Sequence, residues 1–382
     1  MKLKINILAL LLALTGINTS CTNHRSLFTP TRSEIVKSMQ NVADWQMDHF
    51  SYSTEKNLHD YGIDSWTNGT LYIGLLELAK IAGDGSVYMK WLEKIGAVTE
   101  WKIPANFGNN PRYKYYHADE LCIGQFYLGM YDLKKDPSIY LSTKERADWI
   151  MNNPGDTTLH QRNKQLWTWC DALFMAPSVY AHLYLMEDNE KYISFMDFEF
   201  KRTYHYLYDK EYGLFFRDGS YFEKREQNGE KIFWGRGNGW VAAGLVRILK
   251  LLPANSTYRP FYEKLFQEFV PRVASLQNAE GFWHASLLDT VNYPSPEISA
   301  TALITYAIAY GINKGLLSEK EYISKALNGW KALNKAIDEN GKLGWVQPIG
   351  ADPKKVTADM TASYGIGAFL LAGSELYRLV RK

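Results

Sequence analysis

The chain has 382 residues, of which 46% are hydrophobic and 22% charged, and this balance excludes an intrinsically disordered protein. Its 43 basic and 41 acidic residues almost cancel, which argues against a nucleic-acid partner because such binding needs a basic surface. Three cysteines are too few for a disulfide framework, and there is no CxxC or HExxH motif for zinc, so we expect no metal and no other cofactor.

The N-terminus, residues 1–20, has the pattern of a bacterial export signal. Two lysines accompany an apolar run over residues 5–14, which is too short for a convincing membrane span. Cys21 follows, as in a lipoprotein whose first mature residue is lipidated, although Asn18 stands where an aliphatic residue is usual. The alternative is ordinary cleavage beside an incidental cysteine. We expect export to the periplasm or outer membrane, with a lipid anchor at Cys21 as the only membrane contact. Cleavage there removes both lysines and leaves 41 basic and 41 acidic residues.

Residues 30–382 contain no linker or low-complexity segment, so we expect a single domain. Apolar residues recur at spacings of three and four, as at Leu71, Leu75 and Leu78, and this period predicts helices almost throughout. The predicted helices span residues 31–50, 65–82, 86–100, 117–132, 141–152, 169–186, 189–207, 236–252, 258–276, 296–314, 318–336 and 360–380.

The predicted helices fall into six pairs. The first helix of each pair is amphipathic and charged, as in segment 258–276. The second is rich in glycine, alanine, serine and aromatic residues, as in 236–252 and 296–314, and a helix that is apolar on most sides is buried. Buried helices inside a ring of amphipathic ones form an (α/α)6 barrel, so the predicted fold class is all-α.

Polar and aromatic residues that depart from this pattern gather at the start of each inner helix. Inner helices of such a barrel run parallel, so their N-termini open on one end and form a single funnel with partial positive charge. Capping alone would explain Asp119 or Thr361, but not two carboxylates, an arginine, a histidine and several tryptophans together. The clusters are Trp66–Gly69, His117–Glu120, Trp169–Asp171, Trp234–Trp240, Pro296–Ser299 and Thr361–Tyr364.

Three segments at these helix starts carry a family resemblance. Trp169–Pro177, Trp234–Trp240 and His117–Asp119 resemble glycoside hydrolase family 105, the unsaturated rhamnogalacturonyl hydrolases. The related family 88, the unsaturated glucuronyl hydrolases, shares the architecture, and the resemblance covers roughly residues 35–380. It implies an enzyme that removes a 4,5-unsaturated uronic acid from the non-reducing end of lyase-generated oligosaccharides, of rhamnogalacturonan type or related. The implied reaction protonates C4 and adds water at C5, after which the hemiketal opens and releases the next sugar.

Site residues follow from matching this chain to the family motifs one residue at a time. The resemblance implies that Asp171 is the acid and base, that Asp119 is the second active-site carboxylate, and that His160 is an active-site histidine. It also implies a substrate pocket built from Trp234, Arg236, Asn238 and Trp240. Their positions in the chain add further candidates for substrate contact, namely Trp66, His284, Ser299 and Thr301.

The residues around Asp171 suit a proton donor, because a tryptophan and a cysteine precede it and the apolar segment 172–176 follows. A free aspartate has a pKa of about 3.9, and burial beside the like charge of Asp119 would raise it. The alternative role is a buried helix cap, which would leave a costly unpaired charge. Arg236 lies between glycines and its guanidinium suits a carboxylate, although those glycines could serve only to start the helix. For each tryptophan, packing in the core is an equal alternative.

Two other functions are compatible with the sequence. A conventional inverting glycosidase on the same barrel would use Asp119 and Asp171 as its base and acid. A non-catalytic glycan-binding lipoprotein would keep the aromatic funnel without an aspartate of raised pKa. Substrate choice separates the two enzymes, since only the hydration reaction demands an unsaturated sugar. Replacement of Asp171 separates either enzyme from the binding protein.

Overall fold

A computed structural model of the protein describes residues 29–52, 62–83, 85–104, 116–153, 155, 159 and 167–380. The predicted export signal, Cys21 and His160 lie outside the described residues. The outer helices are α1 (Arg32–Asp48), α3 (Val87–Val98), α6 (Leu141–Asn152), α9 (Glu190–Leu207), α11 (Arg259–Ser275) and α13 (Glu319–Lys335). The inner helices are α2 (Trp66–Ala82), α5 (Cys122–Lys134), α8 (Pro177–Glu187), α10 (Gly235–Leu251), α12 (Ile298–Asn313) and α14 (Ser363–Leu379).

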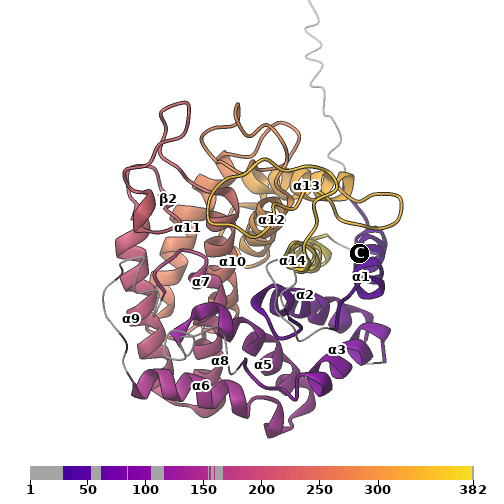
Figure 1. Ribbon diagram of the computed structural model, residues 1–382, viewed down its shortest axis with the longest axis vertical. Helices are drawn as coiled ribbons and strands as arrows, with labels where there is room; N and C mark the ends of the chain where they lie inside the picture. Colours follow the sequence, from indigo (N-terminus) through magenta and orange to yellow (C-terminus); the bar gives the residue numbers. More distant parts are fainter. Residues whose placement is uncertain are drawn as a thin grey trace, which may run out of the picture.

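Within the described residues the inner helices form a closed ring. Helix α2 packs against α5, α5 against α8, α8 against α10, α10 against α12 and α12 against α14, which returns to α2. The outer helices pack on the outside of this ring, each against one or two inner helices. The colours of Figure 1 progress once around the molecule from α1 to α14. The predicted all-α (α/α)6 barrel is confirmed.

Small residues let the inner helices approach closely, as the sequence pattern predicts. A Cβ atom added to Gly367 of α14 would lie 2.2 Å from the carbonyl oxygen of Thr70 in α2. A Cβ atom on Gly74 of α2 would lie 2.4 Å from the carbonyl oxygen of Gly367. Only glycine fits at these positions, because no side chain can occupy a space so near to the backbone of another helix. The close contact holds α2 against α14.

The predicted helix over 169–186 is wrong, because the chain breaks within it. A single turn, α7 (Ala172–Met175), ends at Ala176, and α8 begins at Pro177. Proline has no N–H group and its ring clashes with the preceding turn, so it starts a helix more readily than it continues one. The break leaves Asp171 at the N-cap of a short turn rather than inside a long helix.

The predicted helix over 117–132 is also irregular at its start. It begins with a 3₁₀ turn, η1 (Ala118–Leu121), and becomes α-helical only at Cys122. Asp119 therefore lies in a tight turn that precedes the inner helix α5. Two further 3₁₀ turns in the described residues are η2 (Pro137–Ile139) and η3 (Gly219–Tyr221).

A small antiparallel hairpin follows α9, and the all-helical prediction missed it. Strand β1 (Tyr208–Asp209) pairs with β2 (Leu214–Phe215), and Gly213 just before β2 has a φ of 66°, which favours glycine. The side chain of Asn238 in α10 accepts a hydrogen bond from the Phe215 N–H at 2.8 Å and donates to the Phe215 carbonyl at 3.0 Å. Asn238 thus pairs with β2 as a neighbouring strand would, and it fastens the hairpin to the inner ring.

Candidate active site

A cavity of about 290 Å³ opens at the end of the barrel where the inner helices begin. Ligand sites commonly have volumes of roughly 300–1,000 Å³, so this cavity suits one terminal sugar better than a long chain passing through it. Its walls come from the starts of α2 and α10, from the turns that precede α5 and α8 (η1 and α7), from the segment after β2 and from the loop before α14. The lining residues are Trp66, His117, Asp119, Glu120, Trp169, Asp171, Met175, Arg217, Trp234, Arg236, Trp240, Ile349 and Gly350.

Asp171, the predicted proton donor, is almost enclosed, with 7% of the residue exposed. Its Oδ1 accepts a weak hydrogen bond from the Cys170 thiol at 3.6 Å, and its Oδ2 lies 4.0 Å from Nε of Arg217. Burial raises the pKa of Asp171 to about 6; attraction to Arg217 and Arg236 opposes this rise, and repulsion from Asp119 adds to it. A carboxyl group with this pKa keeps a protonated fraction near neutral pH, as general acid catalysis requires.

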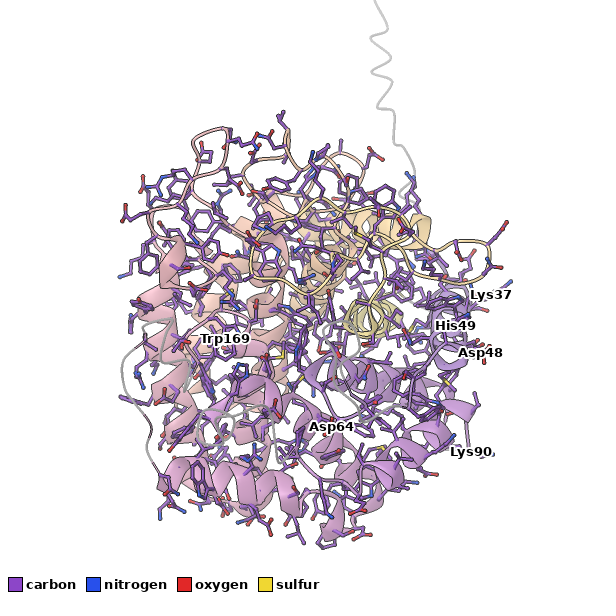
Figure 2. All side chains as sticks on the ribbon, in the orientation of Figure 1. Lys37, Asp48, His49, Asp64, Lys90 and Trp169 are labelled. Atoms are coloured by element: carbon purple, nitrogen blue, oxygen red, sulfur yellow. The ribbon has the colours of Figure 1, made fainter. Side chains whose placement is uncertain are left out.

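Asp119 reaches the same cavity from η1, and 21% of its side chain is exposed. Its Oδ2 lies 3.6 Å from Nδ1 of His117, and the His117 ring packs against Trp169 with centroids 4.7 Å apart. In Figure 2 the labelled Trp169 lies within the ring of helices. The structure brings both predicted catalytic carboxylates into one cavity. Because Asp119 is the more open of the two, their environments differ, as the roles of proton donor and ionised partner require.

Arg236 lies in the cavity wall with only 1% of the residue exposed. Its Nη1 donates to the Gln347 carbonyl and to the Tyr364 hydroxyl, the latter at 2.9 Å, while Nη2 donates to the Pro348 carbonyl at 3.0 Å. The guanidinium also lies over the Trp234 ring, 4.4 Å from its centroid. Arg236 therefore fastens the loop before α14 to α10, and it adds positive charge to the cavity.

Aromatic rings form the apolar wall of the cavity. Trp66, the first residue of α2, stacks on Tyr364 with centroids 5.2 Å apart, and it meets Trp240 edge to face at 6.2 Å. Trp240 packs in turn against Phe174 at 4.7 Å. Trp234 and Trp240 are 2% and 1% exposed, whereas Trp66 is only partly buried. Trp66 is thus the most accessible of the three predicted sugar platforms.

The starts of α12 and α14 do not line the cavity, contrary to the expected funnel of six clusters. Glu297 caps α12 and also accepts the backbone N–H of Gln347 at 3.0 Å. Ser299 and Thr301 are fully buried, and their hydroxyls donate to the Glu297 carboxylate and carbonyl, respectively. His284 lies outside the cavity wall, with its Nδ1 2.8 Å from a backbone carbonyl. The structure does not bring these three predicted contacts to the cavity. Asn238, a fourth predicted contact, also lies outside the cavity wall, because its side chain pairs with the backbone of Phe215 in the hairpin.

Sequence reasoning missed Arg217, which enters the cavity from the segment after β2. The Arg217 carbonyl accepts the Cys170 N–H at 2.8 Å, so the two segments that carry Arg217 and Asp171 are joined. No local motif marks this arginine. Other lining residues that were not singled out are Glu120 and Met175, which lie within segments already noted, and the loop residues Ile349 and Gly350.

Comparison with known proteins identifies the family. The family model described as Glycosyl Hydrolase Family 88 matches residues 38–380, which is most of the chain. The chain belongs to this family. It is 36% identical over 361 residues to an unsaturated 3S-rhamnoglycuronyl hydrolase of Formosa agariphila, covering 91% of each chain. A protein of the same name from Alteromonas sp. is 33% identical over 355 residues, covering 88% of this chain and 84% of that one.

A solved structure supports the same assignment. A glycosyl hydrolase family 88 protein from Bacteroides vulgatus has a TM-score of 0.81 and 30% identity over 92% of this chain and 100% of that one. Family 88 is one of the two families that the motifs resemble, so the resemblance is confirmed. As a family 88 member the chain is a glycoside hydrolase, which decides against a non-catalytic glycan-binding protein. None of the helices in the described ranges is long and apolar enough to cross a membrane.

Proposed function

We propose that this family 88 enzyme removes a 4,5-unsaturated uronic acid from the non-reducing end of an oligosaccharide in which the next sugar is rhamnose. The names of the Formosa agariphila and Alteromonas relatives, both unsaturated 3S-rhamnoglycuronyl hydrolases, support this substrate class. The small cavity supports attack on a terminal sugar. Two buried or half-buried arginines in its wall, Arg217 and Arg236, supply the positive charge that an anionic sugar needs.

The reaction begins when the Asp171 carboxyl group gives its proton to C4 of the sugar. The π electrons of the C4=C5 bond form the new C4–H bond, and the positive charge left at C5 is shared with the ring oxygen. Water adds at C5 and loses a proton to the Asp171 carboxylate, which restores the acid. The hemiketal then opens as the bond between C5 and the ring oxygen breaks. C5 becomes a ketone, and the hemiacetal at C1 releases the next sugar as an alcohol.

The burial of the Asp171 carboxyl group in the cavity wall, which raises its pKa, is the observation that carries this mechanism. Proton transfer to carbon needs an acid that is protonated at working pH, and a pKa of about 6 leaves about a tenth of the enzyme protonated at pH 7. The burial of Asp171 in the wall of this cavity, which tryptophans also line, explains why the ionised form is disfavoured. Asp119 stands beside the same cavity as the second carboxylate, and its charge supports the positive charge that develops at C5.

A panel of lyase-generated oligosaccharides tests the proposal, with the saturated form of each as its matched control. We expect the ultraviolet absorbance of the conjugated enol acid to disappear with enzyme, and the saturated sugars to remain intact. A conventional inverting reaction, with Asp119 as base and Asp171 as acid, would cleave both forms because it needs no double bond. Equal cleavage of the two forms would therefore contradict the proposal.

We also propose that the enzyme is exported and anchored through a lipid on Cys21. The support is the sequence pattern alone: a basic start, the apolar run over residues 5–14 and a cysteine at the expected place. In the native bacterium, labelled fatty acid should enter the wild-type protein and not a Cys21→Ala variant, which should move from the membrane to the soluble fraction. Unlabelled wild-type protein in the cytoplasm would contradict both parts of this proposal.

A further inference from the structure

Arg217 is the arginine of the cavity wall whose guanidinium makes fewer hydrogen bonds to the protein. Its side chain is 17% exposed, and Nη1 donates to the Asp218 carboxylate. Its Nε is buried 4.0 Å from Oδ2 of Asp171. Among the described residues, no hydrogen bond is made by Nη2. One end of the guanidinium is thus committed to the protein, while Nη2 remains available to a ligand in the cavity.

Arg236 differs from Arg217 in its exposure and in the number of hydrogen bonds that its guanidinium makes to the protein. It is 1% exposed, and its two Nη groups donate to three acceptors of the protein, the Gln347 and Pro348 carbonyls and the Tyr364 hydroxyl. Its Nε is buried without a hydrogen bond to any described residue. A carboxylate that enters the cavity therefore finds more accessible N–H groups on Arg217 than on Arg236.

The backbone holds Arg217 firmly beside the proton donor. Its carbonyl accepts the Cys170 N–H at 2.8 Å, and Cys170 directly precedes Asp171. Two residues before Arg217, the backbone of Phe215 is paired with the Asn238 side chain. These contacts fix the distance between the arginine and Asp171, so that a ligand bound by Nη2 lies next to the group that gives the proton.

We propose that Arg217 binds the carboxylate of the uronate, and that this ion pair draws the positive charge of Arg217 away from Asp171 when the substrate is bound. The inference rests on the proposed function, because the unsaturated uronate is what brings a carboxylate into the cavity. Arg217 then has two effects in one contact. It selects an acidic sugar, and it leaves Asp171 more readily protonated in the complex than in the free enzyme.

Asp171 is faced by charged or titratable groups from each element around it. Of these, Arg217 is the main group that lowers the pKa of Asp171, followed by Arg236. Loss of the Arg217 charge therefore raises the pKa of Asp171 and extends the protonated form to higher pH. The groups are Cys170 in the preceding position, Asp119 and Glu120 in η1, His117 before it, Arg217 and Asp218 after β2, Tyr221 in η3 and Arg236 in α10.

The test compares the unsaturated uronyl substrate with its methyl ester in wild-type enzyme and in Arg217→Gln. We expect Arg217→Gln to lower kcat/KM for the acid by roughly 10- to 100-fold, mainly through KM, because a charge-assisted contact is lost. The ester, which has no carboxylate, should change by no more than about threefold, within the spread of a lost neutral hydrogen bond. Arg225→Gln is the matched control, because Arg225 is exposed and lies outside the cavity wall.

Three further measurements make the result decisive. The pH above which kcat/KM falls should be higher in Arg217→Gln than in wild type, because the Arg217 charge lowers the pKa of Asp171. If Arg217→Gln does not fold, Arg217→Lys replaces it, and its loss should again be confined to the acid. Calorimetry measures the binding of a saturated uronate and of its methyl ester, and so compares acid with ester without turnover. If the acid binds through Arg217 but the enzyme does not act on unsaturated sugars, the proposed function fails while this inference stands.

Two outcomes overturn the inference. Equal losses for acid and ester in a folded Arg217 variant would make Arg217 a structural residue. Selective loss of the acid in Arg236→Gln, with Arg217→Gln unaffected, would assign the carboxylate to Arg236 instead.

Discussion

Replacement of Asp171 by asparagine should remove activity and stabilise the folded protein at alkaline pH. The amide cannot deliver a proton, and general acid–base catalysis typically contributes about 10²–10⁴-fold, so kcat should fall by at least that range. The stability effect follows from the pKa of Asp171, which rises from 3.8 to about 6 on folding. This rise in pKa corresponds to about 3 kcal/mol.

The sign of this effect depends on pH. Below about pH 4 the carboxyl group is protonated in folded and unfolded chains alike, so it costs nothing. As pH rises to about 6, the unfolded chain loses its proton first, and the free energy of unfolding falls. Above about pH 6 the full penalty is present. Asparagine removes it, so the gain for Asp171→Asn should reach up to about 3 kcal/mol at pH 8 and vanish at pH 4.

Chemical denaturation of wild type and Asp171→Asn at pH 4 and pH 8, with kcat measured on the same preparations, checks both parts. Asp48→Asn is the matched control, because Asp48 is exposed and lies at the outer edge of the molecule in Figure 2. It should change neither quantity. An Asp171→Asn protein with nearly full turnover, or one that is less stable than wild type at pH 8, would refute the reasoning.

Three other predictions follow from the same geometry. The value of kcat/KM should fall above about pH 6 as Asp171 ionises, and a rate that keeps rising from pH 6 to pH 8 would exclude Asp171 as the acid. Asn238→Ala should lower the free energy of unfolding by about 2–4 kcal/mol, because the Phe215 backbone groups lose their partners. It should also lower kcat/KM, because Arg217 is less firmly held. Unchanged stability in urea denaturation would contradict this prediction. A chelator should leave activity unchanged, because the proton comes from a carboxyl group, and activity lost to a chelator and restored by a divalent ion would overturn that expectation.

The barrel could be predicted because its signals are local and repeated. Thr31 and Glu34 cap α1 reciprocally, and such pairs of residues mark helix starts in the sequence. The contrast between amphipathic and small-residue helices separated outer from inner elements. Pro177 was also visible, and it should have ended the predicted helix over 169–186, since proline more often begins a helix than continues one.

The composition of the site was harder to predict, because its key contacts join distant segments. Asp171 and Trp240 belong to motifs that can be recognised locally. Arg217 reaches the cavity only because Cys170 binds its carbonyl and Asn238 holds the hairpin. Asn238 lies in the same motif as Arg236, yet its amide pairs with a strand that the helical period could not reveal. Residues that act through long-range backbone pairing leave no periodic pattern in the sequence.

The most direct test of the account is to follow isotopes from solvent into the released sugar. Protonation by Asp171 at C4 and addition of water at C5 predict deuterium on C4 after turnover in deuterated water, and heavy oxygen on C5 after turnover in labelled water. Conventional hydrolysis would place the heavy oxygen on C1 and not on C5, so the position of the oxygen label separates the two routes. Label at C4 and C5 would support the hydration mechanism, whereas label at C1 alone would contradict it.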